Sequence, residues 1–348
     1  MASFLCRTKY TVGWISPLRD ELVVAIEMLD EEHGMPMQTP KEDTNTYYLG
    51  KIGDHNIAMA CLAGGQMGIG SAAVVGENMR RTFKNIRFAL LVGIGGGVPS
   101  KEKDVRLGDV VVSYPDGPYP GIVQYDYGKL HADGEIETKG WLNAPPSKLL
   151  AAVDMLRVLH SRPKNPINNM CKIIDELGPE FAYPGDKHDS PDHLYPVEYP
   201  HITRPGSETC KSCDTTRILH RVNREHPHKP NVHYGIIASG NLVVKDGVGR
   251  EKIDKRYRNL IWCCEMEAAG LVNNFPCLAI RGITDYCDSH KNDTWRKRAI
   301  AAACAYSKEL LLHIERTDVE EMECAVNVMK AVQEKEMKRW NKPRSSAG

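Results

Sequence analysis

Short apolar segments alternate with helical patterns along this chain, and this alternation constrains the fold most strongly. Residues 10–16 (YTVGWIS), 88–94 (FALLVGI) and 277–283 (CLAIRGI) are short and apolar, as buried strands are. Amphipathic helical patterns at 19–32 and 71–83 lie between the first two segments. Strands that are buried on both faces need helices on each side. The alternation therefore predicts a three-layer α/β/α fold around a central mixed, largely parallel sheet.

The same signals continue through the rest of the chain. They predict a hairpin in 47–65, strands in 106–116, 232–240, 261–267 and 277–285, and helices in 147–161 and 165–177, from Ala268, and in 294–314.

Composition changes between about 178 and 230, where Pro, His, Asp, Lys and Arg replace aliphatic residues. This predicts an irregular insertion that lies on the surface. We expect residues 1–315 to form a single domain with that insertion at about 178–230. Residues 316–348 should form a C-terminal helix, over 319–340, and a flexible tail.

The charge balance gives no support for a nucleic acid or an anionic membrane as a partner. The chain has 45 Lys and Arg against 45 Asp and Glu, so its formal net charge is zero. Nothing therefore favours a nucleic-acid surface or an anionic membrane. No run approaches the roughly 18 apolar residues of a membrane span, and residues 1–10 (MASFLCRTKY) show no apolar h-region or cleavage site. We expect a cytoplasmic protein that binds neither nucleic acid nor membrane.

The chain has 11 cysteines, several of them in apolar segments, which favours reduced thiols over a disulfide framework. Cys210 and Cys213 form a CKSC pair that resembles half of a zinc site. Four histidines lie nearby in the sequence: His201, His220, His226 and His228. A second close pair is missing, and a surface loop or a local thiol pair is the favoured interpretation. We therefore assign no metal ligand and no cofactor.

Reactive residues fall at the ends of three predicted strands. The glycine run 93–97 follows one strand, Glu265 and Glu267 follow another, and Asp285 ends a third. Ligand sites in such sheets form at the carboxyl ends of the strands. The coincidence predicts one shared pocket.

Each of these features also has a plainer interpretation. The GIGGG run is either a tight turn or a ligand-contacting loop, because it lacks the further residues of a P-loop or a dinucleotide fingerprint. The pair Glu265 and Glu267 either caps a helix or binds a ligand with several hydroxyl groups. Asp285 is either an N-cap or a proton donor, and Glu21 could serve only the helix dipole. A buried Arg281 would need an anionic partner, which favours a charged pocket.

Together these motifs resemble the nucleoside phosphorylase/nucleosidase superfamily, and especially its methylthioadenosine/adenosylhomocysteine nucleosidase branch. The matching stretches are VGWISPLRDEL, GGQMGIGSAAVV, LLVGIGGGV, LGDVVVS, GIIASGN, EMEAAG and RGITD, in the correct order over about two thirds of the chain. The chain is more similar still to the fungal-type purine nucleosidase domains, which occur alone or at the head of larger signalling proteins. The resemblance implies the nucleoside phosphorylase/hydrolase fold, a homodimer and no cofactor.

The resemblance also implies roles on the sugar side. Glu267 would accept hydrogen bonds from the ribose 2′- and 3′-hydroxyls, and Met266 would pack against sugar and base. Glu265 would support the site. Other substrate-binding positions would be Ile94, Gly95, Gly96, Val243 and Val244.

On the reacting side, the resemblance implies that Asp285 protonates or hydrogen-bonds to purine N7. Glu21 would activate the attacking water, and Arg281 would position that water and the sugar. Such groups suit the cleavage of an N-glycosidic bond, because the leaving base needs a proton and the ribose becomes positively charged.

Hydrolysis is favoured over phosphorolysis. Superfamily phosphorylases bind phosphate with arginines and a serine, whereas the matching positions here are Leu91 and Ile94, and Arg19 alone is a poor dianion site. Val243 stands where the nucleosidase branch has an aromatic ring against the purine, so the base pocket here is apolar but offers less stacking. The insertion could cover the active site or the 5′ side of the ribose and change the tolerance for 5′ groups, so the methylthio specificity transfers weakly.

We therefore predict a purine nucleoside N-ribohydrolase of purine salvage, acting on adenosine, inosine or guanosine. The alternatives are a methylthioadenosine/adenosylhomocysteine nucleosidase, a phosphate-dependent purine nucleoside phosphorylase, and a non-catalytic purine-sensing or oligomerising module.

Overall fold

The computed structural model describes residues 5–36, 38–132, 134, 136–162, 169–184, 192–202, 210–291 and 293–340. Ten strands form one sheet: β1 (Val12–Ser16), β2 (Glu31–Gly34), β3 (Tyr47–Ile52), β4 (His55–Cys61), β5 (Phe88–Gly97), β6 (Val110–Ser113), β7 (Ile122–Gln124), β10 (Val232–Ser239), β11 (Ile261–Glu265) and β12 (Cys277–Asp285). Their order is β11-β10-β6-β12-β5-β1-β4-β3-β2, with β7 beside β10. A separate hairpin pairs β8 (Gly128–Leu130) with β9 (Ile136–Thr138).

The helices are α1 (Arg19–Glu27), α2 (Ile69–Thr82), α3 (Ser147–His160), α4 (Asn169–Glu176), α5 (Gly247–Arg256), α6 (Ala268–Leu271), α7 (Arg296–Leu312), α8 (Arg316–Glu321) and α9 (Ala325–Trp340). None of those helices is both long enough and apolar enough to cross a membrane, as far as the described residues show.

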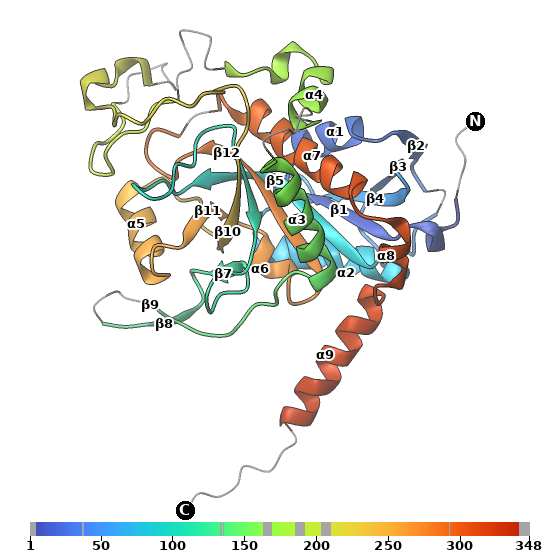
Figure 1. The fold of residues 1–348 in the computed structure, drawn as a ribbon. Helices are drawn as coiled ribbons and strands as arrows, with labels where there is room; N and C mark the ends of the chain where they lie inside the picture. The colour runs from blue at the N-terminus through green and yellow to red at the C-terminus, as the bar shows by residue number, and fades with distance from the viewer. Residues whose placement is uncertain are drawn as a thin grey trace, which may run out of the picture.

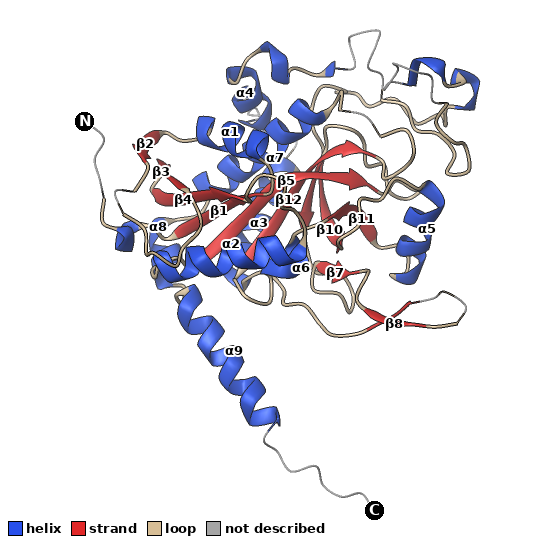
Figure 2. Cartoon of the chain, turned by 180° about the vertical axis from the view of Figure 1, so that it is seen from behind, coloured by secondary structure: helices blue, strands red, loops and turns tan. Residues whose placement is uncertain are grey.

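Two apolar layers hold the helices on opposite faces of the sheet. On one face, Trp14 and Ile280 join a buried cluster with side chains of α1, α3, α4 and α7. On the other, Leu91 and Ala279 join a second cluster with side chains of α2 and α6. Accordingly, α3 stands before the sheet in Figure 1 and α2 stands before it in Figure 2. The predicted three-layer α/β/α architecture with a mixed sheet is confirmed.

Five strands of the sheet close into a ring. β11 runs parallel to β10 and also pairs antiparallel with β5, through Cys263 with Gly97 and Cys264 with Gly96. β5 pairs with β12, β12 with β6, and β6 with β10, which completes the ring. Because of this closure, the three strands that end in the predicted site residues lie together.

The glycine run does not form a loop, as the sequence had suggested, but continues β5 to Gly97. Its glycines permit close packing. A Cβ on Gly93 would lie 2.7 Å from both a carboxylate oxygen of Glu21 and a guanidinium nitrogen of Arg281. A Cβ on Gly96 would lie 2.7 Å from Oδ1 of Asp285. The run is therefore the surface against which site side chains pack.

Two helix predictions were too long. The helix predicted for 19–32 ends at Glu27, because the chain then turns into β2, which pairs with β3. The helix predicted for 319–340 is two helices, α8 and α9. The carbonyl of Met322 between them accepts a hydrogen bond from Arg87, at 2.8 Å. Beyond this break, α9 projects away from the rest of the fold (Figure 1).

Other predictions agree more closely with the structure or fall partly on residues outside the described ranges. The helix predicted for 165–177 is α4; residues 165–168 lie outside the described residues, as does the tail 341–348. The sequence did not predict β2, α5 or the hairpin β8–β9.

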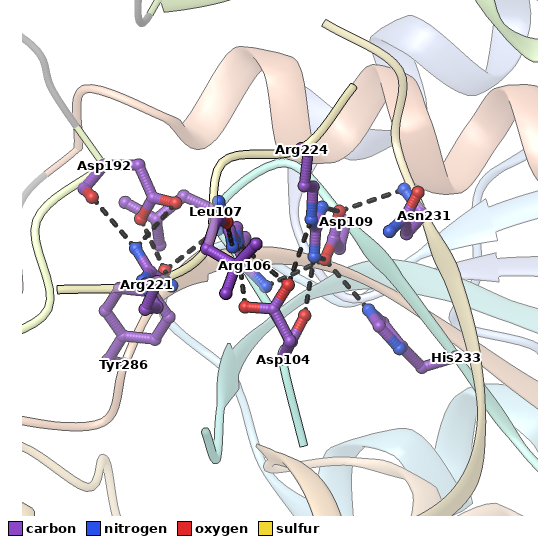
Figure 3. Close-up of polar contacts among 11 residues, drawn as sticks. Asp104, Arg106, Leu107, Asp109, Asp192, Arg221, Arg224, Asn231, His233 and Tyr286 are labelled. Atoms are coloured by element: carbon purple, nitrogen blue, oxygen red, sulfur yellow. Dashed lines mark hydrogen bonds and ion pairs between the residues drawn. The ribbon is translucent and has the colours of Figure 1, made fainter. Parts of the chain in front are cut away.

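The described parts of the 178–230 segment contain short 3₁₀ turns and irregular chain, and two half-buried arginines anchor them beside the sheet. Arg224 donates to both oxygens of Asp109, at 2.7 and 2.8 Å, and His233 of β10 lies 2.9 Å from the same carboxylate. Arg221 donates to the hydroxyl of Tyr286 at 2.8 Å and pairs with Asp192 at 2.9 Å. Figure 3 shows both groups of contacts side by side. The segment is thus fixed beside the end of β12.

Candidate active site

Arg281 lies at the centre of a group of buried carboxylates. Its side chain is on β12 and is fully buried. One guanidinium nitrogen, Nη2, contacts Oε2 of Glu265 and lies 3.4 Å from Oε2 of Glu267. A buried guanidinium is costly without an anion. The two glutamates supply the negative charge that the sequence had predicted for this arginine.

Glu265 ends β11 and has a structural role of its own. Its carboxylate accepts hydrogen bonds from the backbone N–H groups of Glu267 and Ala268, at 3.0 Å. These donors open α6, so Glu265 caps that helix while also contacting Arg281. Of the two interpretations of the E-M-E motif, the helix cap applies to Glu265.

Glu267 contacts the segment around Gly68 as well as Arg281. Its Oε1 accepts a hydrogen bond from the backbone N–H of Gly68 at 3.3 Å, and Oε2 faces Arg281. Burial raises the pKa of Glu267, the charge of Arg281 opposes this, and nearby Glu265 adds to the rise. Gly68 has a φ of +90°, which favours glycine and brings its N–H close to the carboxylate.

Glu21 joins the group from the first turn of α1. Its carboxylate accepts backbone N–H groups from Leu18 at 2.7 Å and from Ile94 at 2.9 Å. Burial raises the pKa of Glu21 to about 7, although Arg281 and the two hydrogen bonds lower it. A carboxylate that is half ionised at neutral pH can act as a general base.

Asp285, at the end of β12, forms an ion pair. Its Oδ1 accepts the backbone N–H of Cys287 at 2.9 Å, and its Oδ2 lies 2.7 Å from Nζ of Lys291. Burial disfavours the charge on Lys291, but the carboxylate of Asp285 outweighs this and raises the pKa of the ammonium group. Lys291 lies six residues after Asp285 in the RGITDYCDSHKN stretch and was not among the predicted site residues.

The remaining predicted site positions differ in how deeply they are buried. Gly95 and Gly96 are buried within β5, whereas Ile94 and Met266 are half-buried. Val243 is 50% exposed, in the loop after β10, and Val244 is half-buried.

That loop reaches the segment that contacts Glu267. Asn241 accepts the backbone N–H of Ile69 at 3.2 Å through its side-chain oxygen. A Cβ on Gly68 would lie 2.9 Å from the same oxygen and 3.9 Å from the carbonyl of Met266. Gly68, Asn241 and Met266 therefore form one wall beside Glu267. Gly68 and Asn241 were not among the predicted site residues, although they lie in the GGQMGIGSAAVV and GIIASGN stretches.

No protein-family model matches the chain. The chain is 40% identical over 309 residues, 88% of its length, to a protein of Hyaloscypha variabilis described as a nucleotide-binding leucine-rich repeat (NLR)-like protein. It spans 30% of the length of that protein.

Solved structures share the fold at low identity. Futalosine hydrolase of Helicobacter pylori matches with a TM-score of 0.53 and 16% identity, over 88% of this chain and 99% of that one. The 5′-methylthioadenosine/S-adenosylhomocysteine nucleosidase of Neisseria meningitidis, in complex with methylthio-immucillin-A, matches with a TM-score of 0.55 and 16% identity, over 87% and 98%. The Streptococcus pneumoniae MTA/SAH nucleosidase matches with a TM-score of 0.52 and 17% identity, over 87% and 98%. The chain therefore has the α/β fold of these nucleosidases.

Proposed function

We propose that this chain is a purine nucleoside N-ribohydrolase, which converts a purine ribonucleoside and water to free base and ribose. The observation that carries the proposal is the cluster of Glu21, Glu265 and Glu267 around the buried guanidinium of Arg281. Its position beside the ends of β5, β11 and β12, on a fold shared with nucleosidases, supports this reading.

On the sugar side, the carboxylates have capacity left for a ligand. An ionised carboxylate offers about four acceptor sites. Glu267 uses one oxygen for Gly68 and turns the other toward Arg281, so it can still accept two ribose hydroxyls. Its negative charge would stabilise the oxocarbenium-like sugar that forms as the glycosidic bond breaks.

On the base side, the ion pair between Asp285 and Lys291 provides a proton. When the bond between C1′ and the base nitrogen breaks, its electron pair goes to the purine. The ammonium group of Lys291 gives a proton to Asp285, and Asp285 gives a proton to N7, which neutralises that charge and makes the base a better leaving group. Lys291 is thus the source of the proton in this scheme and acts through Asp285.

On the water side, Glu21 acts as the general base. Its pKa of about 7 allows the ionised form to take a proton from water near neutral pH. The water oxygen then forms the new bond to C1′.

The charges near Glu21 favour water over phosphate as the nucleophile. The side chain of Arg19 is 88% exposed and pairs with Asp20 at 3.4 Å, so it is not part of the buried cluster. Arg281 already faces two carboxylates. A phosphate dianion placed there would meet those negative charges.

A second candidate is hydrolysis of methylthioadenosine or S-adenosylhomocysteine, because several nucleosidases that share the fold are named for these substrates. Among adenine nucleosides, the two candidates differ only in the 5′ substituent of the ribose. The NLR-like description of the larger relative motivates a third outcome, in which the chain binds purine compounds without turnover.

One experiment separates these outcomes. Adenosine, inosine, guanosine and methylthioadenosine are each incubated with the protein in phosphate-free buffer, and free base and reducing sugar are measured. We expect release of base and ribose in equal amounts from the plain nucleosides. Release only after phosphate addition would refute hydrolysis, and faster release from methylthioadenosine would favour the second candidate. Tight binding with no release from any compound would leave only the sensing role.

A further inference from the structure

A cluster of metal-binding side chains lies in the 178–230 segment, outside the candidate active site. The ligand atoms of His201, Cys210 and Cys213 all lie within 4.8 Å of one another. Cys213 is buried, and the other two are half-buried. The sequence alone did not justify a metal site here, because a second cysteine pair is missing. The structure instead adds a histidine to the first pair.

We propose that His201, Cys210 and Cys213 bind a Zn²⁺ ion in a structural site. Two thiolates and an imidazole are a donor set that Zn²⁺ prefers. Tetrahedral zinc with bonds of about 2.3 Å to sulfur and about 2.1 Å to nitrogen places its ligand atoms roughly 3.6–3.8 Å apart. The three ligand atoms, within 4.8 Å of one another, would have to move together by about 1 Å to reach that spacing. The fourth position is left to solvent or to a neighbouring side chain.

The local backbone brings the two thiols together. Cys210 begins a 3₁₀ turn that ends at Ser212, and the N–H of Cys213 donates to the carbonyl of Cys210 at 3.0 Å. A C-x-x-C turn of this kind is the usual way in which one segment supplies two zinc ligands. Both cysteines are free thiols in the structure.

The surroundings explain why a metal would be useful at this position. None of the three apolar clusters includes any described residue between 182 and 231. Aromatic rings provide part of the packing: His290 stacks on Tyr195 at 4.2 Å between ring centroids, and on Tyr199 at 5.6 Å. Small irregular segments with little aliphatic core commonly need a cross-link or a metal to become ordered.

The cluster also connects the segment to the loop after β12. The N–H of His201 donates to the hydroxyl of Ser289 at 2.9 Å, and Sγ of Cys210 lies 3.8 Å from the carbonyl oxygen of His290. Both contacted residues lie between Asp285 and Lys291. A zinc ion at the cluster would therefore fix the insertion against the loop that holds this ion pair.

Metal analysis of the full chain tests the proposal without depending on any catalytic activity. The protein is purified under reducing conditions, without a metal-affinity step, and its zinc is measured by mass spectrometry. We expect about one zinc per chain. The double substitution Cys210→Ser and Cys213→Ser should remove most of this zinc. The control is Cys6→Ser, which replaces an exposed cysteine near the N-terminus and should leave the zinc content unchanged.

A second measurement covers the case in which the double variant does not fold. The wild-type chain is depleted of metal with a chelator and then titrated with Co²⁺. Thiolate coordination should produce a charge-transfer absorption that saturates at one equivalent and disappears on addition of Zn²⁺. Absence of zinc together with absence of that absorption would overturn the proposal, as would a Cys210–Cys213 disulfide in the reduced preparation.

Discussion

Nζ of Lys291 lies 2.7 Å from Oδ2 of Asp285, so the acid predicted to assist the purine base is half of an ion pair. The two residues are held together by a tight turn, in which Cys287 adopts a φ of +53° and donates its N–H to Asp285. Left-handed backbone at a non-glycine residue is uncommon and costs free energy. The proposed chemistry therefore depends on a lysine and a turn as well as on the aspartate.

Replacing Asp285 should nearly abolish base release. Asp285→Asn keeps the shape of the side chain but can no longer carry the transferred proton, so we expect kcat to fall about 10²–10⁴-fold. The measurement is initial-rate release of base from the substrate found to be best. Asp293→Asn, whose side chain is 81% exposed, is the control and should retain activity. Equal activity in the two variants would remove Asp285 from the mechanism.

Lys291 and Asp285 should be energetically coupled. Lys291→Met leaves a buried carboxylate without its counter-ion, whereas the double variant Asp285→Asn with Lys291→Met leaves no charge. We expect the free energies of unfolding of the two single variants to be non-additive by roughly 0.5–3 kcal/mol. Urea denaturation of all four proteins gives this coupling. Simple additivity would mean that the ion pair does not form in solution.

Glu21 should set the pH dependence of turnover. The general base must be ionised and its pKa is about 7, so kcat/KM should rise about tenfold per pH unit below that value and level off above it. Glu21→Gln should reduce activity and abolish this rise. Asp20→Asn, at a side chain that is 52% exposed one residue earlier, should leave the profile intact. An unchanged acidic limb in Glu21→Gln would assign the rise to another group.

Arg281 should be essential for stability, because it neutralises two buried glutamates. Arg281→Met leaves Glu265 and Glu267 uncompensated, and we expect a loss of about 3–5 kcal/mol in the free energy of unfolding. Adding Glu265→Gln should restore part of the loss, since one of the two negative charges is then absent. Arg19→Met, on an 88% exposed side chain, is the control and should be neutral. A greater loss in the double variant than in Arg281→Met would contradict this charge balance.

Gly93 should not tolerate even one methyl group. In Gly93→Ala the new Cβ would lie 2.7 Å from Glu21 and from Arg281, so one of them must move. We expect a loss of about 1–3 kcal/mol in stability, together with lower activity. Gly70→Ala is the matched control, because nothing lies within 4 Å of its Cβ, and it should be neutral or slightly stabilising. Similar unfolding curves for the two variants would show that β5 can yield at this point.

The apolar periodicity predicted most of the sheet because burial decides where its strands form. Residues 88–94 and 277–285 have no other favourable environment in a folded chain. The glycine run was harder to interpret, because glycine is generally unfavourable in strands. It is a strand because its backbone pairs with β11 and β12, whose residues are distant in the sequence.

Single residues of the site were predicted to different degrees. Glu267 and Asp285 were identifiable because each follows an apolar strand, and the resemblance supplied their roles, which stay predictions, as does the homodimer. Lys291 was not, because its contact depends on the unusual backbone of Cys287. The break between α8 and α9 was also unpredictable, since no Gly or Pro marks it and a distant arginine, Arg87, holds it.

The hydrogen bond between Gly68 and Glu267 joins positions 199 residues apart. The ring of strands closes through the pairing of β5 with β11, in which Cys263 and Gly97 are 166 residues apart. Contacts this far apart in sequence form late, because they must overcome the entropy of closing a long loop. During synthesis, Glu21 and β5 leave the ribosome long before Glu267 and Asp285. The residues of the site therefore cannot come together in a nascent chain that ends before β12. Ligand binding should appear in a single step once β12 has been synthesised.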